Sequence, residues 1–284
     1  MKAYYDMAAR FPWPAERGYY GRGFRLGDRA AAYIRALQWR QRHPDGYLTA
    51  IDDVSWPECA DSAEFNAAWL FANLADEVRM LSEGERTDLP GGENLYDEHL
   101  WHFWKEVRFN PPGGLPIAIA PPPEATARAR SLGFGRPFVV VQPLIDASYN
   151  EWRNQPWEWW MHLVDLLSKR VPVVVAAHRK HSDREKLTKS EVAYSWDLDL
   201  SPMEVLALAQ RSALFVGGET GLSLWAPIMQ VPTYGMIAQQ SCHYLVDTAP
   251  ISFGQPVRVQ PLEAPPEHHL HWIVGFLTRY GLLA

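Results

Sequence analysis

Apolar residues in the second half of the chain form short uninterrupted runs, and segments with helical spacing separate these runs. The runs are PFVVVQP, VPVVVAAH, ALFVGG and VPTYGMI. Between them, residues 157–170, 201–212 and 222–229 place apolar side chains three and four positions apart, which predicts helices. An uninterrupted apolar run is typical of a parallel strand that is buried on both faces. The alternation of strands and helices therefore predicts a doubly wound parallel sheet.

The first half shows the same alternation less clearly. Apolar positions predict a helix over 27–44, a strand in GYLTAIDDV and a second helix over 62–81. A first strand should precede Gly27, but the segment GYYGRGFRL before it is short and rich in glycine. This half is therefore expected to be a second α/β domain.

A proline-rich segment separates the two halves. Residues 110–123 carry six prolines around one short apolar run, which suggests an edge strand at 117–120. Prolines at this density interrupt regular structure, so we expect a domain boundary here. The predicted domains are residues 1–125 and 126–284, and a terminal helix is expected over 268–283.

The composition limits which binding partners and which cellular compartment are expected for this protein. The 284 residues carry a formal net charge of −6 and no run of Lys and Arg, so duplex nucleic acid is not an expected partner. Cys59 and Cys242 are the two cysteines, far apart in sequence, which suggests neither a disulfide framework nor a zinc site. The first residues lack the apolar core of a signal peptide, and we expect a cytoplasmic protein.

The segment FVGGETG joins a predicted strand to a predicted helix and is the strongest candidate for chemistry. Gly217 and Gly218 allow a tight turn and a close approach of the backbone to a ligand. Thr220 and Gly221 begin the next helix, whose free N–H groups favour a phosphate, and Glu219 can accept hydrogen bonds from sugar or ribose hydroxyls. A tight turn between a strand and a helix uses glycine for purely structural reasons too.

From residue 136 to 240 the chain resembles the bacterial heptosyltransferases and their relatives, which are glycosyltransferases of the GT-B fold with two Rossmann-like domains facing across a cleft. That family has a strand ending in hydrophobic-Gly-x-Asp-(Ser/Thr)-Gly, and FVGGETG is similar to it with Glu219 in the place of Asp. The preceding LDLSPMEVLALAQRSAL resembles the helix before that strand. VVVQPLIDASY, which contains Gln142, looks like the family's strand and phosphate-facing loop.

Two positions depart from the family pattern at its Lys-x-Trp-Pro helix start. Arg153 stands in the place of the lysine and Gln155 in the place of the tryptophan. An arginine can still neutralise a diphosphate, and it can do so in bidentate fashion. The departures imply a divergent member whose preferences for sugar and base do not carry over from the family.

The resemblance also implies a catalytic base. In the family a Gly-Asp pair opens the first helix, and its Asp is taken to deprotonate the acceptor hydroxyl. RLGDRAAAYIRALQWRQRHP looks like this segment, which makes Asp28 the candidate base. The alternative is that Asp28 caps the helix, a role that Asp fills well.

Taken together, the resemblance implies a glycosyltransferase that moves a sugar from a nucleotide-sugar donor to a hydroxyl acceptor without a metal and without a further cofactor. The implied donor site comprises Gln142, Arg153, Gly217, Gly218, Glu219, Thr220 and Gly221. The acceptor would be a glycan, a lipid-linked sugar or a protein, and peripheral contact with a membrane would fit. Two alternatives stay open: an inactive nucleotide-sugar-binding protein of the same fold, and another nucleotide-dependent Rossmann-type enzyme such as an oxidoreductase.

Overall fold

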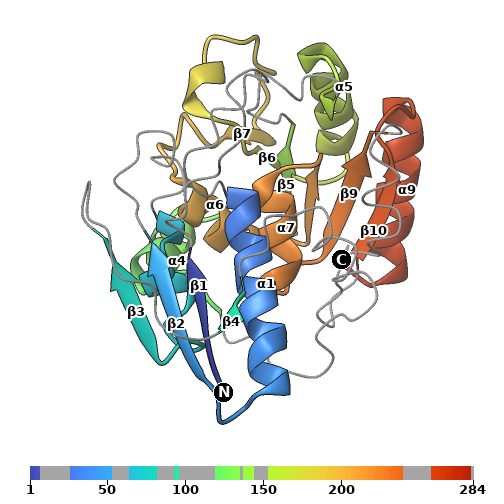
Figure 1. The fold of residues 1–284 in the computed structure, drawn as a ribbon. Helices are drawn as coiled ribbons and strands as arrows, with labels where there is room; N and C mark the ends of the chain where they lie inside the picture. Colours follow the sequence, from blue (N-terminus) through green and yellow to red (C-terminus); the bar gives the residue numbers. More distant parts are fainter. Residues whose placement is uncertain are drawn as a thin grey trace, which may run out of the picture. The chain divides into compact units, whose positions relative to one another are not determined.

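The described part of the chain forms two parallel sheets, each with its own helices (Figure 1). The computed structural model describes residues 1–6, 26–52, 64–81, 93–95, 119–134, 137–143, 153–238 and 257–282. It divides into two compact units, Met1–Ile119 and Ala120–Ala284.

Unit 1 carries a four-stranded sheet with the order β3-β2-β1-β4, and every pairing in it is parallel. Its elements are β1 (Lys2–Asp6), α1 (Leu26–Arg42), β2 (Tyr47–Asp52), α2 (Ala67–Leu70), β3 (Glu77–Met80) and β4 (Glu93–Asn94). The predicted helix over 27–44 and the strand in GYLTAIDDV are confirmed as α1 and β2.

The prediction of a helix over 62–81 is wrong except for a single helical turn. Only Ala67–Leu70 is helical, and Glu77–Met80 is a strand that pairs with β2. The segment before this strand is held by the Asp76 carboxylate, which accepts the Leu48 N–H at 2.7 Å. Pairing with β2 therefore overrides the helical spacing of the apolar residues.

The first strand lies well before the segment in which it was expected. β1 begins at Lys2, close to the amino terminus, and aligns with β2 from Lys2↔Tyr47 to Asp6↔Ile51. GYYGRGFRL falls almost wholly outside the described residues. The general prediction that a strand precedes α1 is thus correct, whereas its position is not.

Unit 2 carries a six-stranded sheet with the order β10-β9-β8-β5-β6-β7, again parallel throughout. Its strands are β5 (Val139–Gln142), β6 (Val173–Val175), β7 (Val192–Tyr194), β8 (Leu214–Gly217), β9 (Thr233–Ile237) and β10 (Val257–Pro261). Its helices are α4 (Pro123–Ser131), α5 (Trp157–Ser168), α6 (Pro202–Ala209), α7 (Gly221–Ile228) and α9 (Pro266–Arg279), with a short 3₁₀ helix, η4 (Arg179–His181). Strands are added on one side of β5 and then on the other, so the order reverses between β5 and β8.

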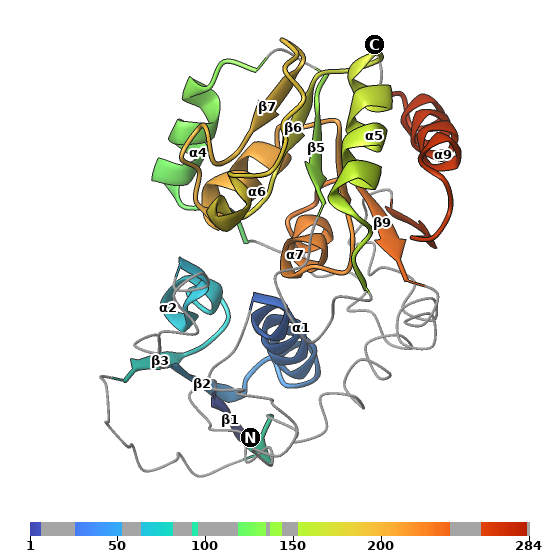
Figure 2. The ribbon, with the colours of Figure 1, turned by 90° about the horizontal axis from the view of Figure 1, so that it is seen from above.

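Helices cover both faces of this sheet. Alternate strand residues such as Val139, Val141 and Val216 pack with α5 and α9 in one core cluster. In Figure 2, α5 and α9 lie on one side of the strands and α4 and α6 lie on the other. Burial on both faces explains why these strands read as continuous apolar runs.

The ends of unit 2 refine two sequence-based expectations. α4 packs against α6 and belongs to unit 2, so the division at residue 119 lies a few residues before the predicted one at 125. The edge strand expected over 117–120 does not form in its two described residues, and 117–118 lie outside the described part.

The predicted terminal helix is confirmed as α9. No helix in the described ranges has the length and apolar character needed to cross a bilayer.

Candidate functional site

The reversal of strand order in unit 2 brings two predicted site residues together. Gln142 ends β5 and Gly217 ends β8, and the two are register partners in adjacent strands. In open parallel sheets, ligands bind outside the carboxyl ends of the strands at the point where the order reverses. The fold therefore places these residues where a nucleotide-binding site is expected.

A hydroxyl network connects this point to α7. Thr220 is the N-cap of α7, and its hydroxyl oxygen accepts the Ser223 N–H at 3.2 Å. The same hydroxyl donates to the side-chain oxygen of Gln142 and lies 3.0 Å from the Ser223 hydroxyl. The network fixes the start of α7 against the end of β5.

The two glycines of this turn have different roles. A Cβ on Gly217 would lie 2.5 Å from the Ser223 hydroxyl oxygen, so only glycine fits beside the network. A Cβ on Gly218 would meet its nearest neighbours at 3.9 Å, an ordinary contact distance. Neither residue has a positive φ. Gly217 is thus required by close packing, whereas Gly218 is buried and a Cβ there would make no close contact.

An arginine and a glutamate complete the corner. The Nε atom of Arg153, just before α5, lies 3.3 Å from a carboxylate oxygen of Glu219. The Glu219 side chain is 2% exposed, whereas that of Arg153 is 24% exposed. The Arg153 side chain is therefore partly accessible to solvent. It lies beside Glu219, the residue before the N-cap of α7. A cation and a helix N-terminus at one corner favour a bound anion.

The structure brings the residues of the predicted donor site together: Gln142, Arg153 and residues 217–221 meet at the carboxyl ends of β5 and β8. Asp28 belongs to unit 1 and is the third residue of α1. It lies in the first turn of the helix rather than at an N-cap. The side chain of Asp28 is outside the described part of the structure.

Comparison with family models and with curated proteins finds no match to the sequence. Comparison with solved structures finds a glycosyltransferase of family 9 from Veillonella parvula DSM 2008, with a TM-score of 0.62 and 11% identity over 98% of this chain and 97% of that chain. The ADP-heptose LPS heptosyltransferase II of E. coli is similar with a TM-score of 0.58 and 10% identity over 99% of this chain and 100% of that chain.

The chain has the fold of these two glycosyltransferases. The predicted α/β class with two Rossmann-like domains is confirmed. At such low identity the likeness establishes the fold, and the roles of individual residues rest on the geometry of the corner.

Two histidines that follow β6, His178 and His181, lie in structural environments. His178 accepts the Lys180 N–H at 3.1 Å and so caps the short helix η4. Burial, followed by the nearby Arg184 and Lys180 charges, lowers the pKa of His181 to about 4, so this imidazole is neutral at pH 7. Within the described residues, no group of three or more His, Cys, Asp or Glu side chains could hold a metal ion.

The tryptophans near the site that the structure describes belong mainly to the core. Trp157 and Trp160 are 4% and 1% exposed, and Trp159 packs against the same core cluster. Trp157 and Trp160 are therefore core residues and do not line a groove. Trp101, Trp104 and Trp152 lie outside the described residues.

Two features of the structure were not predicted from the sequence. Ser223 joins the hydroxyl network, and its position three residues after the Thr220 cap could have indicated this. The other feature is a buried ion pair between Arg29 and Asp52 in unit 1, which nothing in the spacing of these residues indicates.

Proposed function

We propose that this chain is a glycosyltransferase that moves a sugar from a nucleotide-sugar donor to a hydroxyl acceptor. The observation that carries the proposal is the corner at the reversal of strand order, where Arg153, the Gln142–Thr220 hydrogen bond and the start of α7 meet. The likeness in fold to two glycosyltransferases supports it.

Each group at the corner suits one part of such a donor. The accessible side of Arg153 and the N–H groups at the start of α7 would neutralise the diphosphate. A glycine at position 218 would let the turn lie close to the donor. Glu219 holds the guanidinium of Arg153 through the ion pair at 3.3 Å, in addition to the predicted hydrogen bonds to donor hydroxyls.

The proposed reaction has one bond-forming and one bond-breaking event. The acceptor oxygen bonds to the anomeric carbon of the sugar, the bond from that carbon to the phosphate oxygen breaks, and the nucleoside diphosphate leaves. The Asp28 carboxylate would take the proton of the hydroxyl, which is a poor nucleophile without a base. Arg153 and the helix N-terminus would stabilise the charge on the leaving diphosphate, so the proposal needs no metal ion.

The proposed setting is the cytoplasm, at the stage where cell-surface glycans or related glycoconjugates are made. The acceptor would be a glycan, a lipid-linked sugar or a protein, with contact at the membrane surface where the acceptor is lipid-linked. Support for a glycan acceptor comes from one fold neighbour, which is named an ADP-heptose LPS heptosyltransferase.

Native mass spectrometry with UDP-, GDP-, ADP- and CDP-sugars, and NAD⁺ as a control, tests the proposal. The expected result is retention of at least one nucleotide sugar and slow release of its nucleoside diphosphate through transfer to water. Retention with no release, also in the presence of glycan acceptors, would favour the inactive binding protein. Retention of NAD⁺ alone would favour an oxidoreductase and contradict the proposal.

A further inference from the structure

An ion pair fully withdrawn from solvent lies at the carboxyl end of β2 in unit 1. Nη1 of Arg29 is 2.6 Å from one Asp52 oxygen and Nη2 is 3.1 Å from the other, and both side chains are 0% exposed. Arg29 belongs to the first turn of α1, directly after Asp28. Asp52 is the last residue of β2.

Further hydrogen bonds make this pair a junction of four segments. The Asp52 carboxylate accepts the Ala67 N–H at 2.9 Å, at the start of α2. The Arg29 guanidinium donates to the Phe65 carbonyl at 3.2 Å. The first turn of α1, the end of β2, residue 65 and the start of α2 are thus held together through two side chains.

Stability alone does not account for such a pair. Removing two charges from water is costly, and apolar residues of similar volume are often as stabilising as a buried ion pair. Apolar contacts are not directional. A bidentate arginine–carboxylate contact is directional, because it permits a single arrangement of the groups it joins. The pair is therefore suited to fixing the geometry of the first turn of α1.

We propose that Arg29 and Asp52 are positioning residues that hold the backbone of Asp28 in the place its reaction requires. This inference rests on the proposed function, in which Asp28 is the base. An error of about 1 Å in the placement of a catalytic group can lower a rate by roughly a hundredfold. The pair acts through the backbone and does not itself meet the substrate.

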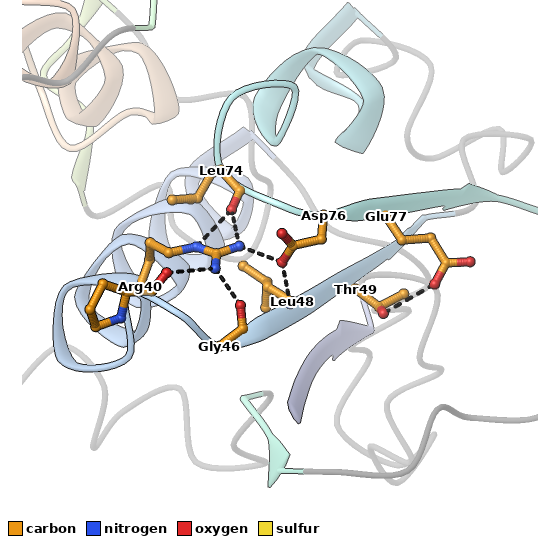
Figure 3. Close-up of polar contacts among 8 residues, drawn as sticks. Arg40, Gly46, Leu48, Thr49, Leu74, Asp76 and Glu77 are labelled. Atoms are coloured by element: carbon orange, nitrogen blue, oxygen red, sulfur yellow. Dashed lines mark hydrogen bonds and ion pairs between the residues drawn. The ribbon is translucent and has the colours of Figure 1, made fainter. Parts of the chain in front are cut away.

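The opposite end of α1 supplies a matched control. Arg40 donates to the Leu74 and Gly46 carbonyls and to the Asp76 carboxylate at 2.6 Å, as Figure 3 shows. This anchor joins α1 to the segments before β2 and β3, at the other edge of the sheet. The two side chains of the Arg40–Asp76 pair are 19% and 37% exposed.

The experiment compares the double variant Arg29→Met/Asp52→Leu with Arg40→Met. In the double variant we expect a folded protein, unchanged donor affinity, a kcat lowered by about tenfold to a hundredfold, and a lower NMR order parameter for the Asp28 amide. In Arg40→Met we expect a lower melting temperature with unchanged kcat and an unchanged order parameter at Asp28. Arg29→Lys keeps the charge but not the bidentate contact, and we expect an intermediate kcat.

Wild-type kcat and order parameter in the folded double variant would overturn the proposal. If the double variant does not fold, full activity of Arg29→Lys would overturn it instead. A third outcome combines two results: the wild-type protein transfers no sugar, and the order parameter at Asp28 still falls in the double variant. This outcome would contradict the proposed function, but it would support the role of the pair in ordering the first turn of α1. No change in the order parameter, whatever the activity, would contradict the positioning role.

Discussion

Each unit has an arginine–carboxylate pair at the carboxyl edge of its sheet, and the two pairs differ in exposure and geometry. In unit 2, Arg153 Nε lies 3.3 Å from a Glu219 carboxylate oxygen, and the arginine side chain is 24% exposed. In unit 1, Arg29 and Asp52 make two contacts at 2.6 and 3.1 Å with both side chains fully buried. A partly accessible cation can bind a ligand, whereas a closed bidentate pair can only hold other groups in place. We therefore propose donor binding at the edge in unit 2 and positioning at the edge in unit 1.

Among the substitutions that test the difference between the two pairs, we expect the largest effect on activity at Asp28. Asp28→Asn should lower turnover by about 10² to 10⁴ because a base acts in the transition state, and it should leave donor affinity unchanged because the donor corner belongs to unit 2. Loss of a charge from the first turn should lower the melting temperature by no more than about 4 °C. The transfer rate, calorimetry of donor binding and thermal melting of this variant distinguish a catalytic role in unit 1 from donor binding in unit 2. A fully active variant would mean that the base is another residue.

Arg153→Ala should weaken the binding of a nucleoside diphosphate by about 1.5–3 kcal/mol, through lost charge-assisted contacts. Arg153→Lys is the matched variant and should show a smaller loss, because it keeps the charge without the planar fork. Titration calorimetry measures both. Equal affinities in the wild type and both variants would contradict a role for Arg153 in donor binding, and with it the proposed functional difference between the two edges.

A buried histidine gives unit 2 a dependence on pH that does not involve the donor corner. His269 Nδ1 lies 3.0 Å from the Tyr234 hydroxyl, and burial lowers the pKa of His269 to about 4. An unfolded histidine titrates near pH 6.5, so below that pH the unfolded chain takes up a proton that the folded unit does not. Stability contributed by neutral His269 is present above pH 6.5 and is lost as the pH falls toward 4.

At pH 5 this loss should be on the order of 2 kcal/mol relative to pH 7.5, measured by urea unfolding. His269→Phe should show a smaller difference between the two pH values, whatever its stability at pH 7.5. The same difference in both proteins would assign the acid sensitivity to other groups.

The smallest effect concerns the cap of α7. Thr220→Val removes the hydroxyl that caps the helix and should cost about 1 kcal/mol, which corresponds to a melting-temperature loss of about 2–4 °C in a unit of this size. Thr220→Ser retains the hydroxyl and should melt close to the wild type. Equal melting of the two variants would mean that the network at the donor corner contributes nothing to stability.

The sequence was most informative where burial alone decides the structure. VVVQ and LFVG become β5 and β8 because strands covered on both faces need uninterrupted apolar residues. Glu77–Met80 has no such run, and its strand depends on pairing with β2 and on the contacts of Asp76. These are tertiary contacts that the periodicity of a single segment cannot indicate.

The same limit applies to the candidate site. The strand-to-helix spacing indicated the turn from Gly217 to Gly221, and the family resemblance indicated a cation at Arg153. The pairing of Glu219 with Arg153, and of Arg29 with Asp52, depends on which strands lie side by side in the folded chain. Only the structure supplies that information.

Hydrogen exchange of the wild-type protein with and without a mixture of ADP, UDP, GDP and CDP tests the central claim most directly, because it locates binding without reference to any variant. The account predicts added protection in residues 140–143 and 217–223, at the ends of β5 and β8 and the start of α7, with little change at Arg29 and Asp52. Added protection confined to unit 1, or no added protection at 217–223 at saturating nucleotide, would contradict it.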